Sequence, residues 1–269
     1  MRMLDLWIPY ILYACIGAVA GVAAGLLGVG GGTIIVPALY ATFSFFSPSQ
    51  PYPMQTAIGT SLASIIFSSL SSALSYKKRN SVALEIVKKM SSGVFLGCCV
   101  GGFLAHLISG SFLKGTFGLF ALAIALRFFF SKPHYSSNEG GVDKKTMGPP
   151  AFFLSFISSL LGIGGGVLFI PYLHFLKISH IKAIGTSSAL SAKVSFFGAL
   201  FYILFGLFNI PISITEVGFI YVPAFLTLSI FSFLTAPLGV KLAHILPQNI
   251  SRKLFACSMF TAGLFMIFG

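Results

Sequence analysis

The sequence predicts an all-α membrane protein that crosses the bilayer many times. We expect it to be an inverted repeat of two halves, with about 8–10 transmembrane segments that include glycine-broken half-helices. Three observations favour this fold class. The composition is strongly apolar, long apolar segments recur along the chain, and a glycine-rich motif occurs twice.

The composition excludes most other classes of protein. Of the 269 residues, 56% are hydrophobic and 8% are charged. A soluble domain carries about 25% charged residues, so a soluble enzyme is excluded. The apolar content also excludes a disordered chain, and four cysteines are too few for a disulfide scaffold. The chain is therefore expected to lie in a lipid bilayer.

Ten apolar segments follow one another along the chain. A crossing needs about 20 apolar residues, and the segments at 150–162 and 165–178 are short for one. Glycines separate these two, as they separate 8–27 from 31–46, and the sequence leaves open whether such pairs cross fully or re-enter. The ten segments are 8–27, 31–46, 55–76, 90–109, 112–131, 150–162, 165–178, 183–206, 217–241 and 251–268.

A polar stretch at 132–148 divides the chain near its centre. We interpret it as a cytoplasmic linker between a first transmembrane repeat at 1–131 and a second, inverted repeat at 149–269.

The basic residues indicate an orientation. The net charge is +12, which in a soluble protein would suggest nucleic acid, but here the basic clusters lie between apolar spans and no nucleic-acid partner is expected. On the ten-segment scheme most of them share one face, so that face is predicted to be cytoplasmic and both termini to lie outside. The residues on this face are Lys77, Lys78, Arg79, Lys88, Lys89, Arg127, Lys132, Lys144, Lys145, Lys177, Lys182, Lys241, Arg252 and Lys253.

Two motifs recur in the same order. LLGVGGGTIIVPAL at 26–39 returns as LLGIGGGVLFIPYL at 160–173, and AIGTS at 57–61 returns at 183–187. The loop after the first AIGTS segment is basic, whereas the loop after the second has no basic residue, so the two halves should have opposite orientations. A weaker match pairs Ala105-His106 with Ala243-His244.

The triple glycines are candidate substrate-binding segments. Each glycine costs about 1 kcal/mol in a helix interior, so the motif favours a break, and the helix that restarts would aim its N–H groups at an anion. Tight helix packing is the alternative explanation. The candidate residues are Gly30, Gly31, Gly32, Thr33 and Pro37 in the first copy, and Gly164, Gly165, Gly166 and Pro171 in the second.

Hydroxyl groups and one lysine complete the candidate site. Thr60, Ser61, Thr186 and Ser187 could donate to an oxyanion, or could bond back to the preceding helical turn. Lys193 lies deep inside an apolar span that has no acidic partner, so an anionic ligand or a structural role would account for it. The sequence has no catalytic nucleophile–base set, no metal-ligand pattern and no cofactor motif, so an enzyme, a metal and a cofactor are not expected.

The duplicated GLLGVGGGTIIVPAL and LLGIGGGVLFIPYL, each followed by AIGTS, closely resemble the sulfite exporter TauE/SafE family of membrane permeases. The resemblance extends from about residue 10 to the C-terminus. It implies transport of sulfite, sulfonates or related sulfur-containing anions across a bacterial inner membrane. The positions that match the family pattern are the glycines and prolines of both motifs and the Gly-Thr-Ser triplets at 59–61 and 185–187. Lys193 lies outside that pattern.

The main hypothesis is a permease that moves a small sulfur-containing anion by alternating access between the two repeats. A passive anion channel and a carrier of a non-sulfur anion are the alternatives, and a membrane enzyme or scaffold is a third class. The glycine ladders Gly17/Gly21/Gly25 and Gly97/Gly101 indicate helix contacts, and a homodimer is possible. The anion, the direction of transport and the coupling ion stay open.

Overall fold

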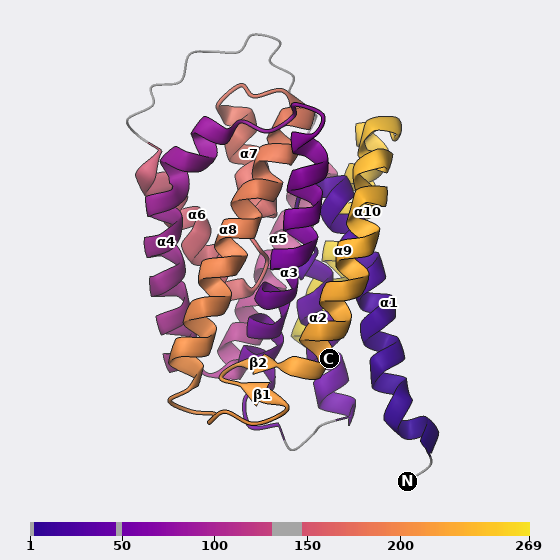
Figure 1. Cartoon of the computed structure of the whole chain (residues 1–269), viewed down its shortest axis with the longest axis vertical. Helices are drawn as coiled ribbons and strands as arrows, with labels where there is room; N and C mark the ends of the chain where they lie inside the picture. The colour runs from indigo at the N-terminus through magenta and orange to yellow at the C-terminus, as the bar shows by residue number, and fades with distance from the viewer. Residues whose placement is uncertain (1–2, 47–49, 131–146) are drawn as a thin grey trace.

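The computed structural model describes residues 3–46, 50–130 and 147–269. Within these ranges the chain forms ten helices and one short two-stranded hairpin (Figure 1). The helices are α1 (Met3–Leu27), α2 (Gly32–Phe46), α3 (Pro53–Lys77), α4 (Leu84–Leu107), α5 (Gly110–Phe130), α6 (Gly148–Leu161), α7 (Gly166–Phe175), α8 (His180–Gly206), α9 (Val222–Ile245) and α10 (Gln248–Phe268), with β1 (Glu216–Val217) and β2 (Ile220–Tyr221) between α8 and α9.

The protein is a multi-pass helical membrane protein, as predicted. Among the described residues, seven helices are long and apolar enough to cross a membrane, and α2, α6 and α7 are shorter apolar helices. Every predicted segment corresponds to one helix. The predicted linker lies outside the described residues, except for its last two.

Three helix starts differ from the prediction by five residues or more, and the first is that of α1, at Met3 instead of residue 8. Helix α4 begins at Leu84 instead of residue 90, because Glu85 and the lysines after it lie on a helix that extends beyond the apolar segment. Helix α9 begins at Val222 instead of residue 217, because β1 and β2 pair as an antiparallel hairpin with Gly218 at φ +55° between them.

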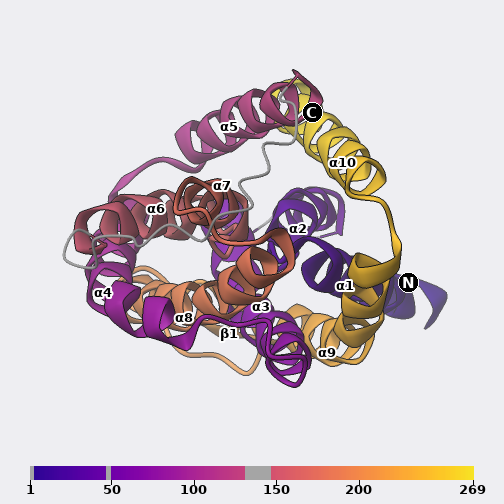
Figure 2. The same ribbon diagram turned by 90° about the horizontal axis from the view of Figure 1, so that it is seen from above.

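The helices surround two short ones. Seen from above, α2 and α7 lie inside, while α5 and α10 form one side of the molecule (Figure 2). Helix α3 crosses α8 next to them, and α3 is the most buried of the candidate membrane spans. The large apolar side chains on the outside are exposed, as expected for a surface that faces lipid.

The glycine ladders pack inside the chain. A methyl group at Gly21 would lie 2.4 Å from the Ser232 carbonyl oxygen of α9, and one at Gly97 would lie 2.3 Å from the Phe152 carbonyl oxygen of α6. The ladders therefore bring α1 against α9 and α4 against α6, as small residues do in membranes. Because these contacts lie within one chain, the ladders give no support to a dimer, which stays a prediction.

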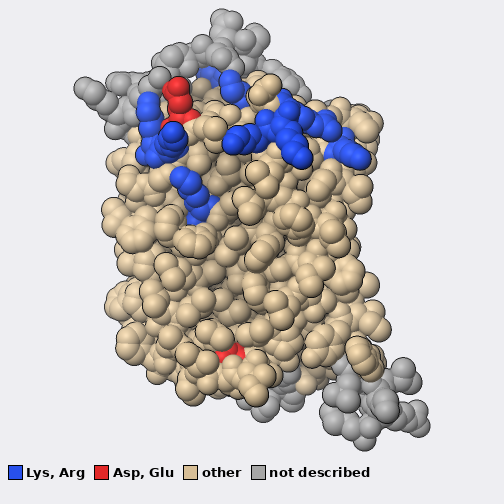
Figure 3. Space-filling model, in the orientation of Figure 1, with Lys and Arg blue, Asp and Glu red and all other residues tan. Residues whose placement is uncertain are grey.

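Charge gathers at one end of the molecule. In the space-filling view, Lys and Arg lie at one end, above a broad band without charged side chains (Figure 3). Both the start of α1 and the end of α10 lie at the opposite end (Figure 1). Most described basic residues lie in or beside the connections that join α3 to α4, α7 to α8, and α9 to α10.

Candidate functional site

The two glycine motifs form helix breaks of the same conformation. The first break joins α1 to α2 and has positive φ at Gly28, Gly30 and Gly31. The second joins α6 to α7 and has positive φ at Gly162, Gly164 and Gly165, each 134 residues further along the chain. Residues other than glycine rarely adopt positive φ, so the backbone conformation requires glycine at these positions in both breaks. We call the residues 28–31 and 162–165 the two glycine turns.

The glycine turns pack against each other's helices. A methyl group at Gly32, the first residue of α2, would lie 2.3 Å from the Gly162 carbonyl oxygen. A methyl group at Gly166, the first residue of α7, would lie 2.1 Å from the Gly28 carbonyl oxygen. The starts of α2 and α7 therefore meet across the boundary between the two repeats.

The meeting point lies at the middle of helix α3. Ile65 is the central residue of α3 (Pro53–Lys77). Methyl groups at Gly30 and at Gly164 would lie 2.6 and 2.8 Å from the Cγ2 atom of Ile65. The two glycine turns thus come together at mid-depth, around one buried side chain.

Both glycine turns present the N-terminus of a helix. The Ile34 and Leu168 amides donate to the carbonyl oxygens of Gly31 and Gly165, both at 3.0 Å. The N–H groups just before them, in the first residues of α2 and α7, are among those that a helix start leaves without an intrahelical acceptor. Such N–H groups and the helix dipole favour an anion. Thr33 is buried there, whereas Pro37 and Pro171 lie one turn further inside.

The predicted threonines cap helices of the opposite repeat. Thr60 Oγ1 accepts a hydrogen bond of 2.9 Å from the amide of Tyr221, just before α9. Thr186 Oγ1 accepts one of 2.9 Å from the amide of Ala83, just before α4, and also donates to its own preceding turn. Both threonines therefore hold the two repeats together.

The predicted serines bind the glycine turns of the opposite repeat. Ser61 Oγ donates to the Gly162 carbonyl oxygen at 3.0 Å, and Ser187 Oγ donates to the Gly28 carbonyl oxygen at 3.1 Å. These hydroxyl protons already have acceptors, so in this structure Ser61 and Ser187 position the glycine turns.

Two other serines lie beside the turns with unbonded hydroxyls. Ser69 and Ser195 are fully buried, and their Oγ atoms have no hydrogen-bond partner among the described residues. A methyl group at Gly30 would lie 3.0 Å from Ser69 Oγ, and one at Gly164 would lie 3.3 Å from Ser195 Oγ. The sequence analysis missed both residues. They follow the AIGTS serines by eight residues in each repeat, so a longer alignment of the two halves would have found them.

Lys193 lies at the centre of α8 and points away from the glycine turns. Its Nζ donates to the Ser91 hydroxyl of α4. The residues that follow it, Val194 and Ser195, contact the second glycine turn instead. The structure thus brings together the glycines and the Ser61 and Ser187 hydroxyls of the predicted site. The two threonine hydroxyls bond instead to amides just before α9 and α4, and the Lys193 amine lies between α8 and α4.

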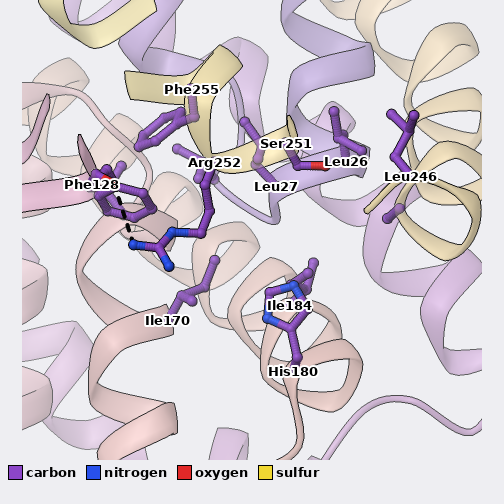
Figure 4. A pocket seen from close by; sticks show the side chains of 13 residues that line it. Leu26, Leu27, Phe128, Ile170, His180, Ile184, Leu246, Ser251, Arg252 and Phe255 are labelled. Carbon is purple, nitrogen blue, oxygen red and sulfur yellow. Dashed lines mark hydrogen bonds between the residues drawn. The ribbon is translucent and has the colours of Figure 1, made fainter. Parts of the chain in front are cut away.

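One cavity at the basic end reaches the glycine motifs. It has a volume of about 60 Å³ and is lined by Val29 and Val167 of the two motifs, together with His180, Ser251 and Arg252 (Figure 4). A larger cavity of about 430 Å³ lies between α1 and α10 and is lined mainly by alanine, valine and leucine. Both cavities are lined mostly by apolar residues, and of the two only the smaller one has a basic side chain in its lining.

Paired glycine breaks, buried at mid-depth and bonded across two repeats of a multi-pass helical protein, define the class of membrane transporters with discontinuous helices. The chain belongs to the sulfite exporter TauE/SafE family, whose model matches residues 13–266. The chain is therefore a membrane transporter, and the family and its relatives are named as transporters and not as enzymes.

Three relatives align with most of the chain. A probable membrane transporter protein of Haemophilus influenzae is 28% identical over 95% of this chain and 97% of its own length. One of Methanocaldococcus jannaschii is 27% identical over 95% and 94%, respectively. The probable membrane transporter protein YunE of Bacillus subtilis is 29% identical over 74% and 80%. No solved structure matches the chain.

Proposed function

We propose that this transporter carries a small sulfur-containing oxyanion, such as sulfite or a sulfonate, and that the anion binds where the two glycine turns meet. The α2 and α7 N-termini would supply amide donors and the positive ends of two helix dipoles. Ser69 and Ser195 would supply hydroxyl donors from α3 and α8. The substrate class is taken from the family's description as sulfite exporters.

Seven buried serine hydroxyls have no hydrogen-bond partner among the described residues. The observation that carries this proposal is that two of them, Ser69 and Ser195, lie beside the glycine turns. Buried polar groups are almost always hydrogen-bonded, and leaving one without a partner costs about 1–3 kcal/mol. Ser69 and Ser195 occupy equivalent positions, 126 residues apart, beside equivalent glycines. A bound oxyanion would give both hydroxyls an acceptor.

The packing supports a mechanism in which the repeats move. Gly32 and Gly166 leave no room for a methyl group, so an anion beside the serines requires the glycine turns to separate. The contacts between the repeats come in equivalent pairs: α1 with α9, α6 with α4, and Ser61 and Ser187 with the opposite turns. We infer that the halves are inverted copies that rock about α3 and α8 to open each end in turn.

Two contacts support closure at the end that holds the termini. Tyr52 packs edge-on against Phe219 with ring centroids 5.7 Å apart, and Gln50 donates to Glu216 Oε1 at 2.6 Å. At the basic end, the cavity beside Arg252 reaches Val29 and Val167. Lys193 would add positive potential at mid-depth without touching the anion.

Transport by purified protein in liposomes tests the proposal. Labelled sulfite should enter in a saturable manner, and unlabelled sulfite inside the vesicles should accelerate its entry. The reason is that a carrier with substrate bound returns to the outer face of the membrane faster than an empty one. A passive channel would show no such acceleration and would give a current. Protein-free liposomes are the control. If they took up sulfite, thiosulfate, taurine and sulfoacetate as fast as liposomes that contain the protein, the proposed substrate class would be overturned.

A further inference from the structure

An arginine lines the cavity that leads from the basic end toward the glycine turns. Arg252 lies in the first turns of α10, and its guanidinium extends into the cavity on the opposite side from His180 (Figure 4). Val29 and Val167 line the same cavity and belong to the two glycine motifs. A cavity of about 60 Å³ admits several waters or one small oxyanion.

The guanidinium is held in place by the end of α5. Arg252 Nη2 donates to the Phe128 carbonyl oxygen at 3.3 Å, and its Cζ lies 5.8 Å from the centroid of the Phe128 ring. Arginine presents five N–H donors in a planar fork that suits oxyanions.

The first repeat has a cation at the equivalent position. Ala105-His106 and Ala243-His244 are 138 residues apart, and the same offset relates Lys114 to Arg252 and Phe117 to the equally buried Phe255. Lys114 also lies against an aromatic ring, with its Nζ 5.2 Å from the centroid of Tyr40. The last helix of each repeat therefore has a cation at this position, Lys114 in α5 and Arg252 in α10. Each helix also has a second cation, Arg127 in α5 and Lys253 in α10.

The two cations lie at opposite ends of the molecule. Helices α5 and α10 run antiparallel, since Phe128 near the end of α5 packs edge-on against Phe255 near the start of α10, at 5.1 Å between centroids. At the other end of the pair, a methyl group at Gly118 would lie 2.7 Å from Ile267. Arg252 is thus near the basic end, and Lys114 is near the end that holds the termini.

We propose that Arg252 and Lys114 are the anion-recognition residues of two vestibules, one at each end of the transport path. Arg252 receives the oxyanion when the basic end is open, and Lys114 receives it when the opposite end is open. This inference rests on the proposed function, because it assigns the entry sites of the same anion.

Binding and transport of sulfite by the same preparations test the inference. The variants are Arg252→Gln, which keeps much of the side-chain length, and Lys253→Gln, which removes an exposed neighbouring charge as a matched control. Sulfite affinity is measured by thermal shift in detergent, and uptake is measured in liposomes. We expect Arg252→Gln to bind sulfite at least ten-fold more weakly, and Lys253→Gln to bind like the wild type.

Each outcome decides between the two proposals. If Arg252→Gln and the wild type bind sulfite equally, the role of Arg252 is overturned while the transport proposal stands. If binding depends on Arg252 but no sulfite is transported, the vestibule is supported and the proposed function fails. If wild-type protein binds neither sulfite, sulfate nor thiosulfate, both are overturned. Should Arg252→Gln not fold, Lys114→Gln provides the same comparison at the other end.

Discussion

Single atoms decide how closely the two glycine turns approach. The carbonyl oxygens of Gly28 and Gly162 each accept a serine hydroxyl from the opposite repeat and also lie against the first glycine of the opposite short helix. An added methyl group would have to displace backbone and not a flexible side chain. Positions 32 and 166 therefore require glycine because a side chain would clash with the opposite turn, whereas positions 31 and 165 require glycine because φ is positive there.

At this scale we predict that Gly166→Ala destabilises the protein. Overpacking of a tight core typically costs about 1–3 kcal/mol, which should lower the melting temperature in detergent by roughly 5 °C. Gly115→Ala is the matched control, because a methyl group there would meet nothing within 4 Å and alanine favours the helix. Equal melting temperatures for Gly166→Ala and Gly115→Ala would contradict the packing described here.

Among the elements, the two helical hairpins are the parts that close the site. Helices α1 and α2 form one hairpin and α6 and α7 the other, and each is packed by a glycine ladder against a helix of the opposite repeat. The β1–β2 hairpin covers the end that holds the termini, where Phe219 packs on Tyr52 and Glu216 accepts from Gln50. Opening this end requires those contacts to break.

We therefore predict that a cross-link between Gln50→Cys and Glu216→Cys stops transport. The linked protein should still bind sulfite from the basic end, because the cavity beside Arg252 stays open. Uptake is measured in liposomes before and after reduction, with each single cysteine variant as a control. Unchanged uptake by the fully cross-linked protein would exclude opening at this end. The native cysteines to replace first are Cys15, Cys98, Cys99 and Cys257.

For the whole molecule, charge sets the orientation in the membrane. Most described basic residues gather at one end, in or beside three connections, opposite the start of α1 and the end of α10 (Figures 1 and 3). Basic loops stay in the cytoplasm. We therefore predict that the basic end is cytoplasmic and that both termini lie outside.

A reporter fusion tests this orientation. Alkaline phosphatase fused after Gly269 should be active, and green fluorescent protein at the same place should be dark, because each folds on one side of the inner membrane only. The same reporters inserted within 132–148 should give the reverse result. If the terminus and the linker gave the same reporter activity, the orientation would be wrong.

Much of the architecture could be predicted from the sequence, because apolar length and glycine repeats specify membrane helices and their breaks directly. All ten segments and both glycine breaks were predicted in this way. The β1–β2 hairpin was missed because its apolar residues continue directly into those of α9, so the sequence predicts one segment from residue 217. The roles of the hydroxyls could not be predicted, since whether Ser61 or Ser69 has a free donor depends on contacts with the other repeat.

The most direct test of the central claim is a sulfite titration of the Ser69→Ala/Ser195→Ala double variant beside the wild type. A control variant, Ser64→Ala/Ser188→Ala, removes two buried hydroxyls that bond only to their own helices. A hydrogen bond to a charged group contributes about 1.5–3 kcal/mol, so losing either one should weaken binding about ten-fold or more. The account predicts saturable binding in the wild type and the control and a loss of at least ten-fold in the double variant. Equal affinities in all three proteins would contradict an anion site at the glycine turns.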